Sequence, residues 1–138
     1  MIKKILVAFD GSDKAREAFD FALDICPGKP PEILVVSVVQ PPEPIDIVEM
    51  DAVIDSITQH YEGLLKGLKD SAKEKGVEIK TEVVVGHPAN QIVKYASDKG
   101  CDMIVLGHRG GSKLVDWLLG SVTKRVSSYS SCTVTIVK

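Results

Sequence analysis

Aromatic residues and excess positive charge are both scarce in this chain. Aromatics make up 5% of the 138 residues, and the formal net charge is -2. A protein that binds nucleic acid needs a basic surface, and one that holds single strands also needs aromatic side chains on which bases stack. The composition therefore argues against a nucleic-acid partner.

Cysteine is also sparse. The chain has Cys26, Cys101 and Cys132, and no two of them are spaced as Cys-x-x-Cys. An odd number without paired spacing predicts neither a disulfide framework nor a zinc site. We expect all three to be small core or near-core residues.

Long apolar runs are missing. The opening stretch MIKKILVAFDGS has only a short apolar segment before Asp10, which is too short for a signal peptide, and no stretch reaches the roughly 20 apolar residues of a membrane span. We therefore expect a cytoplasmic protein with no membrane partner.

Hydrophobic residues make up 44%, charged residues 26%, and the mean hydropathy is +0.09, which predicts one globular domain over residues 1–138.

Short apolar stretches alternate with amphipathic ones along the chain. Five stretches rich in Val, Ile and Leu without strict alternation are typical of strands covered on both faces. They are Ile2–Asp10, Glu32–Val39, Glu78–Gly86, Cys101–Gly107 and Cys132–Lys138. Apolar residues at three- and four-residue spacing predict helices between them. The predicted helices are Ser12–Ile25, about Val48 to Lys75 ending at Gly76, Ala89–Lys99 between Pro88 and Gly100, and Ser121 to about Ser130. This order predicts an α/β fold with a parallel sheet and right-handed crossovers.

One segment does not fit this alternation. Gln40–Met50 contains three prolines, so we expect it to be irregular. It leaves the carboxyl end of a predicted strand. It is therefore either a plain connector to the long helix or a lid over a ligand.

Ligands of open parallel sheets bind outside the carboxyl ends of the strands. Asp10 ends the first predicted strand, and its carboxylate can accept two hydrogen bonds from vicinal hydroxyls such as those of a ribose. Asp-Gly-Ser is also a common turn sequence before a helix, so the alternative is that Asp10 has only a structural role in a turn. Ser12 and Asp13 are best explained as residues that start the helix.

A glycine pattern follows the fourth predicted strand. It matches neither the dinucleotide-binding spacing nor the P-loop, but it fits G-x2-G-x9-G-S through Gly107, Gly110, Gly120 and Ser121. Glycines let backbone N–H groups approach an anion, and Gly120-Ser121 opens a helix whose dipole favours a phosphate. Two unrelated turns are the alternative.

These residues resemble the universal stress protein family, and specifically its ATP-binding branch. The resemblance covers the whole chain, from ILVAFDGSDKAREAFDFAL through VVVGHPANQIVKYASDKGCDMIVLGHRGG to LLGSVTKRVSSYSSCTVTIVK. It implies one Rossmann-like open sheet of the adenine nucleotide alpha hydrolase-like kind. Five parallel strands would lie in the order 3-2-1-4-5, with helices on both faces.

The resemblance also implies a nucleotide site, with ATP, ADP or AMP as ligand. Ala8, Phe9 and Val38 would contact the adenine, while Asp10 would hold the ribose or a Mg ion near the phosphates. Leu106 and Gly107 would line the nucleotide, with Arg109 and Gly110 in the loop under the phosphates. The phosphates would be bound by Gly120, Ser121 and Val122.

Two departures from the family pattern bear on assembly and on the loop. The family often has Cys-Pro-Val before the last strand, where this chain has Cys132-Thr133-Val134, and the pair His108-Arg109 replaces small or polar residues. The resemblance implies a homodimer in which the C-terminal edge strand pairs with its copy. The lost proline would alter the geometry of that dimer.

Three functions follow from these observations. The first is an adenine-nucleotide-binding regulatory or stress-response domain. The second is a slow Mg-dependent ATP hydrolase, in which Asp10 serves the metal and His108 orients water, although the sequence offers no P-loop lysine and no strong general base. The third is a dimeric scaffold with an incidental ligand.

Overall fold

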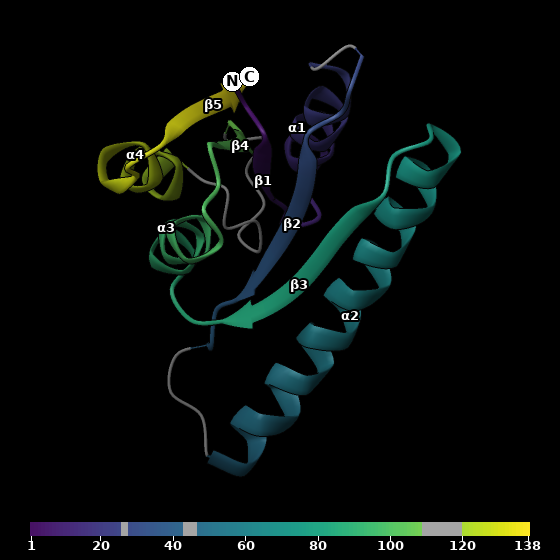
Figure 1. The fold of residues 1–138 in the computed structure, drawn as a ribbon. Coiled ribbons are helices and arrows are strands. Elements are labelled where there is room, and N and C mark those ends of the chain that lie inside the picture. The colour runs from purple at the N-terminus through teal and green to yellow at the C-terminus, as the bar shows by residue number, and fades with distance from the viewer. Residues whose placement is uncertain (26–27, 43–46, 109–119) are drawn as a thin grey trace.

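The computed structural model describes residues 1–25, 28–42, 47–108 and 120–138 (Figure 1). Strands and helices alternate along it as predicted. In chain order they are β1 (Lys4–Ala8), α1 (Asp13–Asp24), β2 (Glu32–Val39), α2 (Ile47–Glu74), β3 (Ile79–Val85), α3 (Pro88–Lys99), β4 (Met103–Gly107), α4 (Gly120–Tyr129) and β5 (Thr133–Val137). Each predicted end lies within two residues of the observed end.

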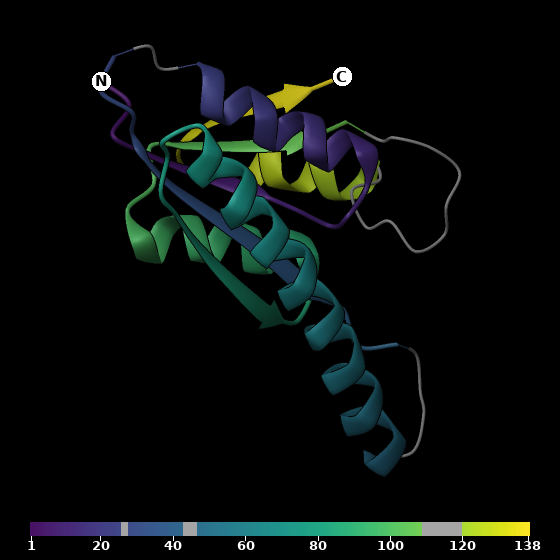
Figure 2. The same cartoon turned by 90° about the vertical axis from the view of Figure 1, so that its right-hand side faces the viewer.

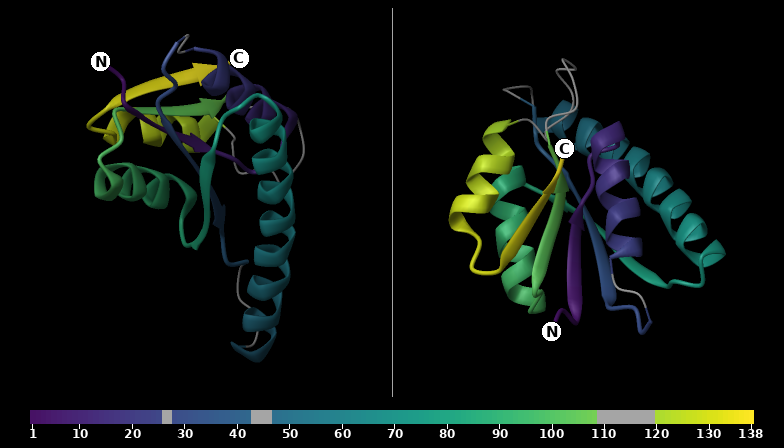
Figure 3. Two further views of the ribbon diagram at one scale, coloured as in Figure 1. Left: turned by 45° about the vertical axis from the view of Figure 1, so that its right-hand side comes forward. Right: turned by 90° about the horizontal axis from the view of Figure 1, so that it is seen from above.

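The five strands form one parallel sheet in the order β3-β2-β1-β4-β5, which confirms the predicted order. Helices α1 and α2 cover one face of this sheet, and α3 and α4 cover the other (Figures 1 and 3). The central strands are buried on both faces, which is why their sequences are continuously apolar. The edge strands β3 and β5 are only partly buried.

Helix α2 is much longer than the strands it crosses. Its 28 residues span about 42 Å, and its amino-terminal half extends past the end of the sheet (Figure 2). The prediction that Gln40–Met50 is irregular is wrong for residues 47–50, because α2 already begins at Ile47. Proline constrains only itself and the residue before it, so the chain after Pro44 is free to become helical. Residues 43–46 lie outside the described residues, and the lid hypothesis is untested.

Two predicted helix-ending glycines are confirmed. Gly100 follows α3 in the left-handed conformation, at φ 68 and ψ 39, and its N–H donates to the carbonyl of Ala96. Gly76 follows α2 at φ 75. Both positions favour glycine because a side chain is strained there.

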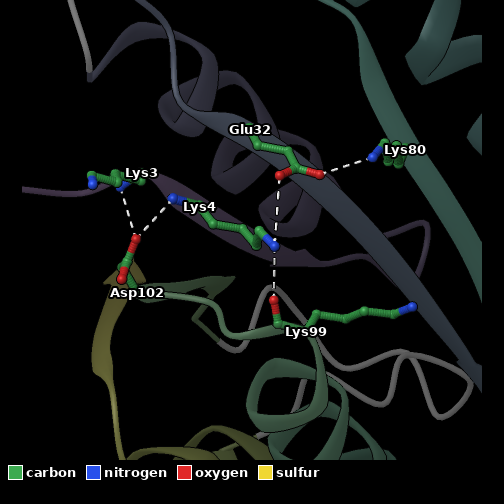
Figure 4. Close-up of polar contacts among 6 residues, drawn as sticks. All are labelled: Lys3, Lys4, Glu32, Lys80, Lys99 and Asp102. Carbon is green, nitrogen blue, oxygen red and sulfur yellow. Dashed lines mark hydrogen bonds and ion pairs between the residues drawn. The ribbon is translucent and has the colours of Figure 1, made fainter.

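A charged network joins the elements at the amino ends of the strands (Figure 4). The Asp102 carboxylate accepts hydrogen bonds from the backbone N–H groups of Lys3 and Lys4, at 2.8 and 2.9 Å. The Lys4 ammonium donates to the Lys99 carbonyl at 2.8 Å and lies 3.6 Å from the Glu32 carboxylate. Asp102 thus ties the start of β4 to the start of β1.

We expect Asp102→Asn to destabilise the protein at neutral pH but not in acid. The two backbone hydrogen bonds hold the pKa of Asp102 below its ordinary value of 3.8. A lowered folded-state pKa adds stability above the unfolded value, and this contribution disappears as pH falls through the folded pKa. Urea midpoints of both proteins, measured over a series of pH values, should therefore differ at neutral pH and approach each other as the pH falls below 3.8. The same difference at every pH would contradict this role of the charge.

Within the described part of the chain, none of the helices combines the length and the apolar character that crossing a membrane requires.

Candidate functional site

The candidate site lies at the carboxyl ends of β1, β2 and β4. All five strands are parallel, so these ends meet at one edge of the sheet. The amino ends of α1 and α4 lie at the same edge, beside the carboxyl end of β4 (Figure 2). The fold therefore brings together three of the segments from which the sequence predicted a site.

Asp10 sits in the turn between β1 and α1. The residue is 6% exposed, and its Oδ1 accepts a hydrogen bond from the N–H of Ser12 at 2.9 Å. Gly11 takes φ 87, which favours glycine, and Ser12 caps α1 by accepting from the N–H of Ala15 at 3.1 Å. Ser12 and Asp13 are thus confirmed as helix-start residues. Asp10 was interpreted either as a structural turn residue or as a ribose contact. The structure gives it the turn role, and the ribose role stays a prediction.

The residues predicted to flank adenine belong to β1, β2 and the chain just after β1. Ala8 ends β1, Val38 lies near the end of β2, and both are fully buried. Phe9 continues the pairing beyond β1, because its N–H donates to the carbonyl of Val36 at 2.9 Å. Because these side chains are buried, an adenine base would contact the backbone and the ends of the strands instead.

Ser37 is a buried polar residue at this edge that the sequence reasoning missed. Its hydroxyl donates to the Phe9 carbonyl at 2.7 Å and so ties β2 to the chain leaving β1. The sequence signal that could have revealed this role was a single serine inside the apolar stretch EILVVSVV. Burial of a lone hydroxyl is costly without a partner, so such a serine indicates a specific hydrogen bond.

Gly107 has a packing role that the sequence did not reveal. A Cβ on Gly107 would stand 2.6 Å from both the carbonyl carbon and the carbonyl oxygen of Lys14 in α1. Real Cβ atoms essentially never come this close to backbone atoms, so glycine is needed for α1 to pack against β4. The adjacent Leu106 is fully buried in β4. Whether these two residues also line a nucleotide remains a prediction.

Gly120 behaves differently. It is the first residue of α4, and no described atom outside its own segment lies within 4 Å of where its Cβ would stand. The described packing thus gives no reason for a glycine here. Ser121 is exposed and Val122 is buried. The prediction that Gly120-Ser121 opens a helix is confirmed, but Ser121 is already inside the first turn, so it is not the residue that caps this helix.

Thr123 is a second polar residue that the sequence reasoning missed. It lies in the first turn of α4, is 5% exposed, and its hydroxyl has no hydrogen-bond partner among the described residues. A buried hydroxyl without a partner costs about 1–3 kcal/mol. The only hint in the sequence was its position two residues after Ser121.

Part of the predicted loop falls outside the described residues. This part includes Arg109 and Gly110. His108 is described: its side chain is exposed, and its backbone N–H donates to the carbonyl of Val137 at 2.7 Å. The described atoms of His108 thus extend the pairing of β4 with β5.

A metal at this edge would need ligands beyond Asp10. Among the described residues, no three His, Cys, Asp or Glu side chains gather closely enough to hold a metal ion. The described chain supplies one carboxylate at the predicted position. A magnesium ion there would take its other ligands from water and from phosphate oxygens, as Mg²⁺ commonly does.

Comparison with known proteins places this geometry in a family. A model of the universal stress protein family matches residues 1–138. The universal stress protein YxiE of Bacillus subtilis (strain 168) is 38% identical over 148 residues, which cover 100% of both chains. MJ0577 of Methanocaldococcus jannaschii has a TM-score of 0.86 and 33% identity, covering 100% of this chain and 96% of that chain. A universal stress protein in complex with cAMP has a TM-score of 0.73 and 26% identity, covering 99% of this chain and 97% of that chain. Because the family model matches its whole length and a relative 38% identical covers all of it, the chain belongs to the universal stress protein family.

Proposed function

We propose that the protein binds an adenine nucleotide at the carboxyl edge of the sheet, with the phosphates at the start of α4 and the ribose at Asp10. The observation that carries the proposal is the first turn of α4. It combines a glycine that the described packing does not require with a buried Thr123 hydroxyl that lacks a described partner. Space for a ligand and an unmet hydrogen-bonding group at a helix N-terminus favour a bound phosphate.

The amino end of α4 supplies the chemistry that a phosphate needs. The first backbone N–H groups of a helix have no partner within the helix, and the dipole adds partial positive charge. Ser121 is exposed in this turn and adds a hydroxyl that can donate to a phosphate oxygen. The related universal stress protein that was solved in complex with cAMP also supports the proposal that the ligand is an adenine nucleotide.

We propose binding, and with it a regulatory role in the stress response, over hydrolysis. Backbone amides, hydroxyls and one carboxylate hold a nucleotide in place. Phosphoryl transfer needs, in addition, a group that orients the attacking nucleophile. A magnesium ion, if bound at Asp10, would neutralise phosphate charge, and the chain's own residues would still act only to hold and orient the ligand.

The Asp10→Asn variant tests the ribose end. The asparagine oxygen can still accept from the Ser12 N–H, so the turn is kept, but the amide NH₂ replaces an acceptor with a donor. Losing hydrogen bonds to a charged group costs about 1.5–3 kcal/mol, so we expect nucleotide affinity to fall by about 10–100-fold in a calorimetric titration. Repeating the titration with EDTA separates a ribose role, which persists, from a metal role, which disappears.

Asp13→Asn is the matched control. Asp13 is exposed in the first turn of α1, and its substitution removes the same charge three residues further along the chain. We expect it to leave affinity unchanged or to raise it slightly, because it takes a negative charge away from the phosphates. Equal effects of the two substitutions would refute a specific contact at Asp10.

We further propose that the protein forms a homodimer through β5. This strand is an edge of the sheet with unpaired backbone groups on its outer side, and Ile136 on it is 36% exposed. Pairing with a second copy would satisfy these groups and cover the apolar side chain. Light scattering at micromolar concentration should give twice the chain mass of 14.9 kDa, and the mass of a single chain would count against the dimer.

A further inference from the structure

Two cysteines lie together at the amino ends of the strands, on the opposite edge of the sheet from the candidate nucleotide site. Cys101 precedes β4 and Cys132 precedes β5. Both line one pocket of about 210 Å³ between the ends of α3 and α4, together with Ser97, Gly100 and Ser130. They come from distant parts of the chain, and the fold gives them a common solvent-connected space.

The pairing of β4 with β5 brings the two cysteines to neighbouring segments. Met103 of β4 lies opposite Thr133 of β5, and Cys101 and Cys132 lie two residues and one residue before this pair. Both residues line the same pocket, and Cys132 is one of the groups whose charge acts on the Cys101 thiol. A disulfide also needs Cα atoms about 4.4–6.8 Å apart, and the peptide map described below tests whether the two cysteines can reach each other.

The two thiols differ in their surroundings. Cys101 is buried, and burial raises the pKa of its thiol to about 11. Cys132 is half-buried, and the Ser130 hydroxyl lies 3.3 Å from its sulfur. The same hydroxyl accepts from the backbone N–H of Cys132 at 3.1 Å, which fixes its position. Cys132 is therefore the thiol that a reagent meets first, beside a group that can donate to its thiolate.

We propose that Cys101 and Cys132 form a modification site for small disulfides. The Cys132 thiolate attacks one sulfur of the reagent, a bond forms between them, and the reagent's own S–S bond breaks to release one thiol. Cys101 then loses its proton to solvent and attacks the Cys132 sulfur, which releases the second thiol. In sum, both cysteines are oxidised to one disulfide, and one small disulfide is reduced to two thiols.

The product would enclose much of the proposed nucleotide site in a covalent loop. Residues 102–131 lie between the two cysteines and include Gly107, Gly120 and Thr123. Closing a loop of this length reduces the freedom of the unfolded chain, so we expect the melting temperature to rise by roughly 5–10 °C. The two functions remain separable, because the thiol reaction needs no nucleotide.

The test incubates the full-length folded protein with 2-hydroxyethyl disulfide and maps its cysteines by peptide mass spectrometry. We expect a Cys101–Cys132 disulfide, with the intact mass lower by two hydrogens. Cys101→Ser should stop at a stable mixed disulfide on Cys132, and Cys132→Ser should leave Cys101 unmodified. Cys26→Ser should behave as the wild type.

The wild-type peptide map decides the proposal even if a variant fails to fold. A disulfide involving Cys26 would overturn the proposal, and so would a mixed disulfide that persists on wild-type Cys132. A folded protein that keeps all its thiols, while the urea-unfolded chain reacts, would overturn it as well.

Discussion

Replacing Gly120 with alanine is expected to weaken adenine-nucleotide binding by at least tenfold while the protein stays folded. In the proposed complex, the added methyl group would take up space in which a phosphate oxygen approaches the first N–H groups of α4. Charge-assisted hydrogen bonds of this kind contribute about 1.5–3 kcal/mol each, and every 1.4 kcal/mol is about tenfold in affinity. The measurement is a calorimetric titration with ATP, AMP and cAMP.

The stability of Gly120→Ala should not fall. No described atom outside its own segment lies within 4 Å of the added Cβ, and alanine favours helix over glycine by up to about 1 kcal/mol. Gly63→Ala is the matched control, because Gly63 lies inside α2 and also has open space at its Cβ. It should keep full affinity. If Gly120→Ala bound nucleotide as tightly as Gly63→Ala does, the phosphate would not lie at the start of α4.

Replacing Gly107 with alanine is expected to act on stability instead. The new Cβ would meet the Lys14 carbonyl group at 2.6 Å and the Lys14 Cβ at 2.9 Å. Backbone atoms cannot swing away as a flexible side chain can, so α1 would have to move from β4. Overpacking of this kind costs about 1–3 kcal/mol, and we expect a loss near the upper end in urea unfolding.

The two glycine variants separate two explanations of one motif. A small loss of stability for Gly107→Ala, below about 0.5 kcal/mol, would show that α1 can adjust and that packing does not demand this glycine. The outcome for Gly120 would stand independently. The motif thus contains one glycine that the packing requires, Gly107, and one glycine that the described packing does not require, Gly120, for which we propose a ligand role.

This division marks what the sequence could and could not predict. Alternating apolar and amphipathic stretches were enough for the element order, because a strand buried on both faces and a helix buried on one face have different apolar periods. The irregular segment was predicted to run to Met50, although α2 begins at Ile47, because the prolines upstream were taken to disrupt residues that they do not reach. Such boundary errors are local and do not change the topology.

The candidate site was harder, because its decisive contacts join residues far apart in the chain. Gly107 packs against Lys14, and Ser37 donates to the Phe9 carbonyl. Neither contact has a signature within a short stretch of sequence. The unpartnered hydroxyl of Thr123 also depends on burial, which emerges only when the helices are placed on the sheet. The spacing predicted a site at the carboxyl ends of the strands, which do meet at one edge of the sheet, and the packing shows which of the residues there have structural roles.

We propose above that this universal stress protein holds an adenine nucleotide at the start of α4. The most direct test is a calorimetric titration of the wild-type chain with ATP, AMP and cAMP, with Gly120→Ala and Gly63→Ala measured alongside. We expect saturable binding of at least one of the three nucleotides to the wild type and to Gly63→Ala, and loss of this binding in Gly120→Ala. A wild-type protein that is folded by circular dichroism and binds none of the three would contradict it.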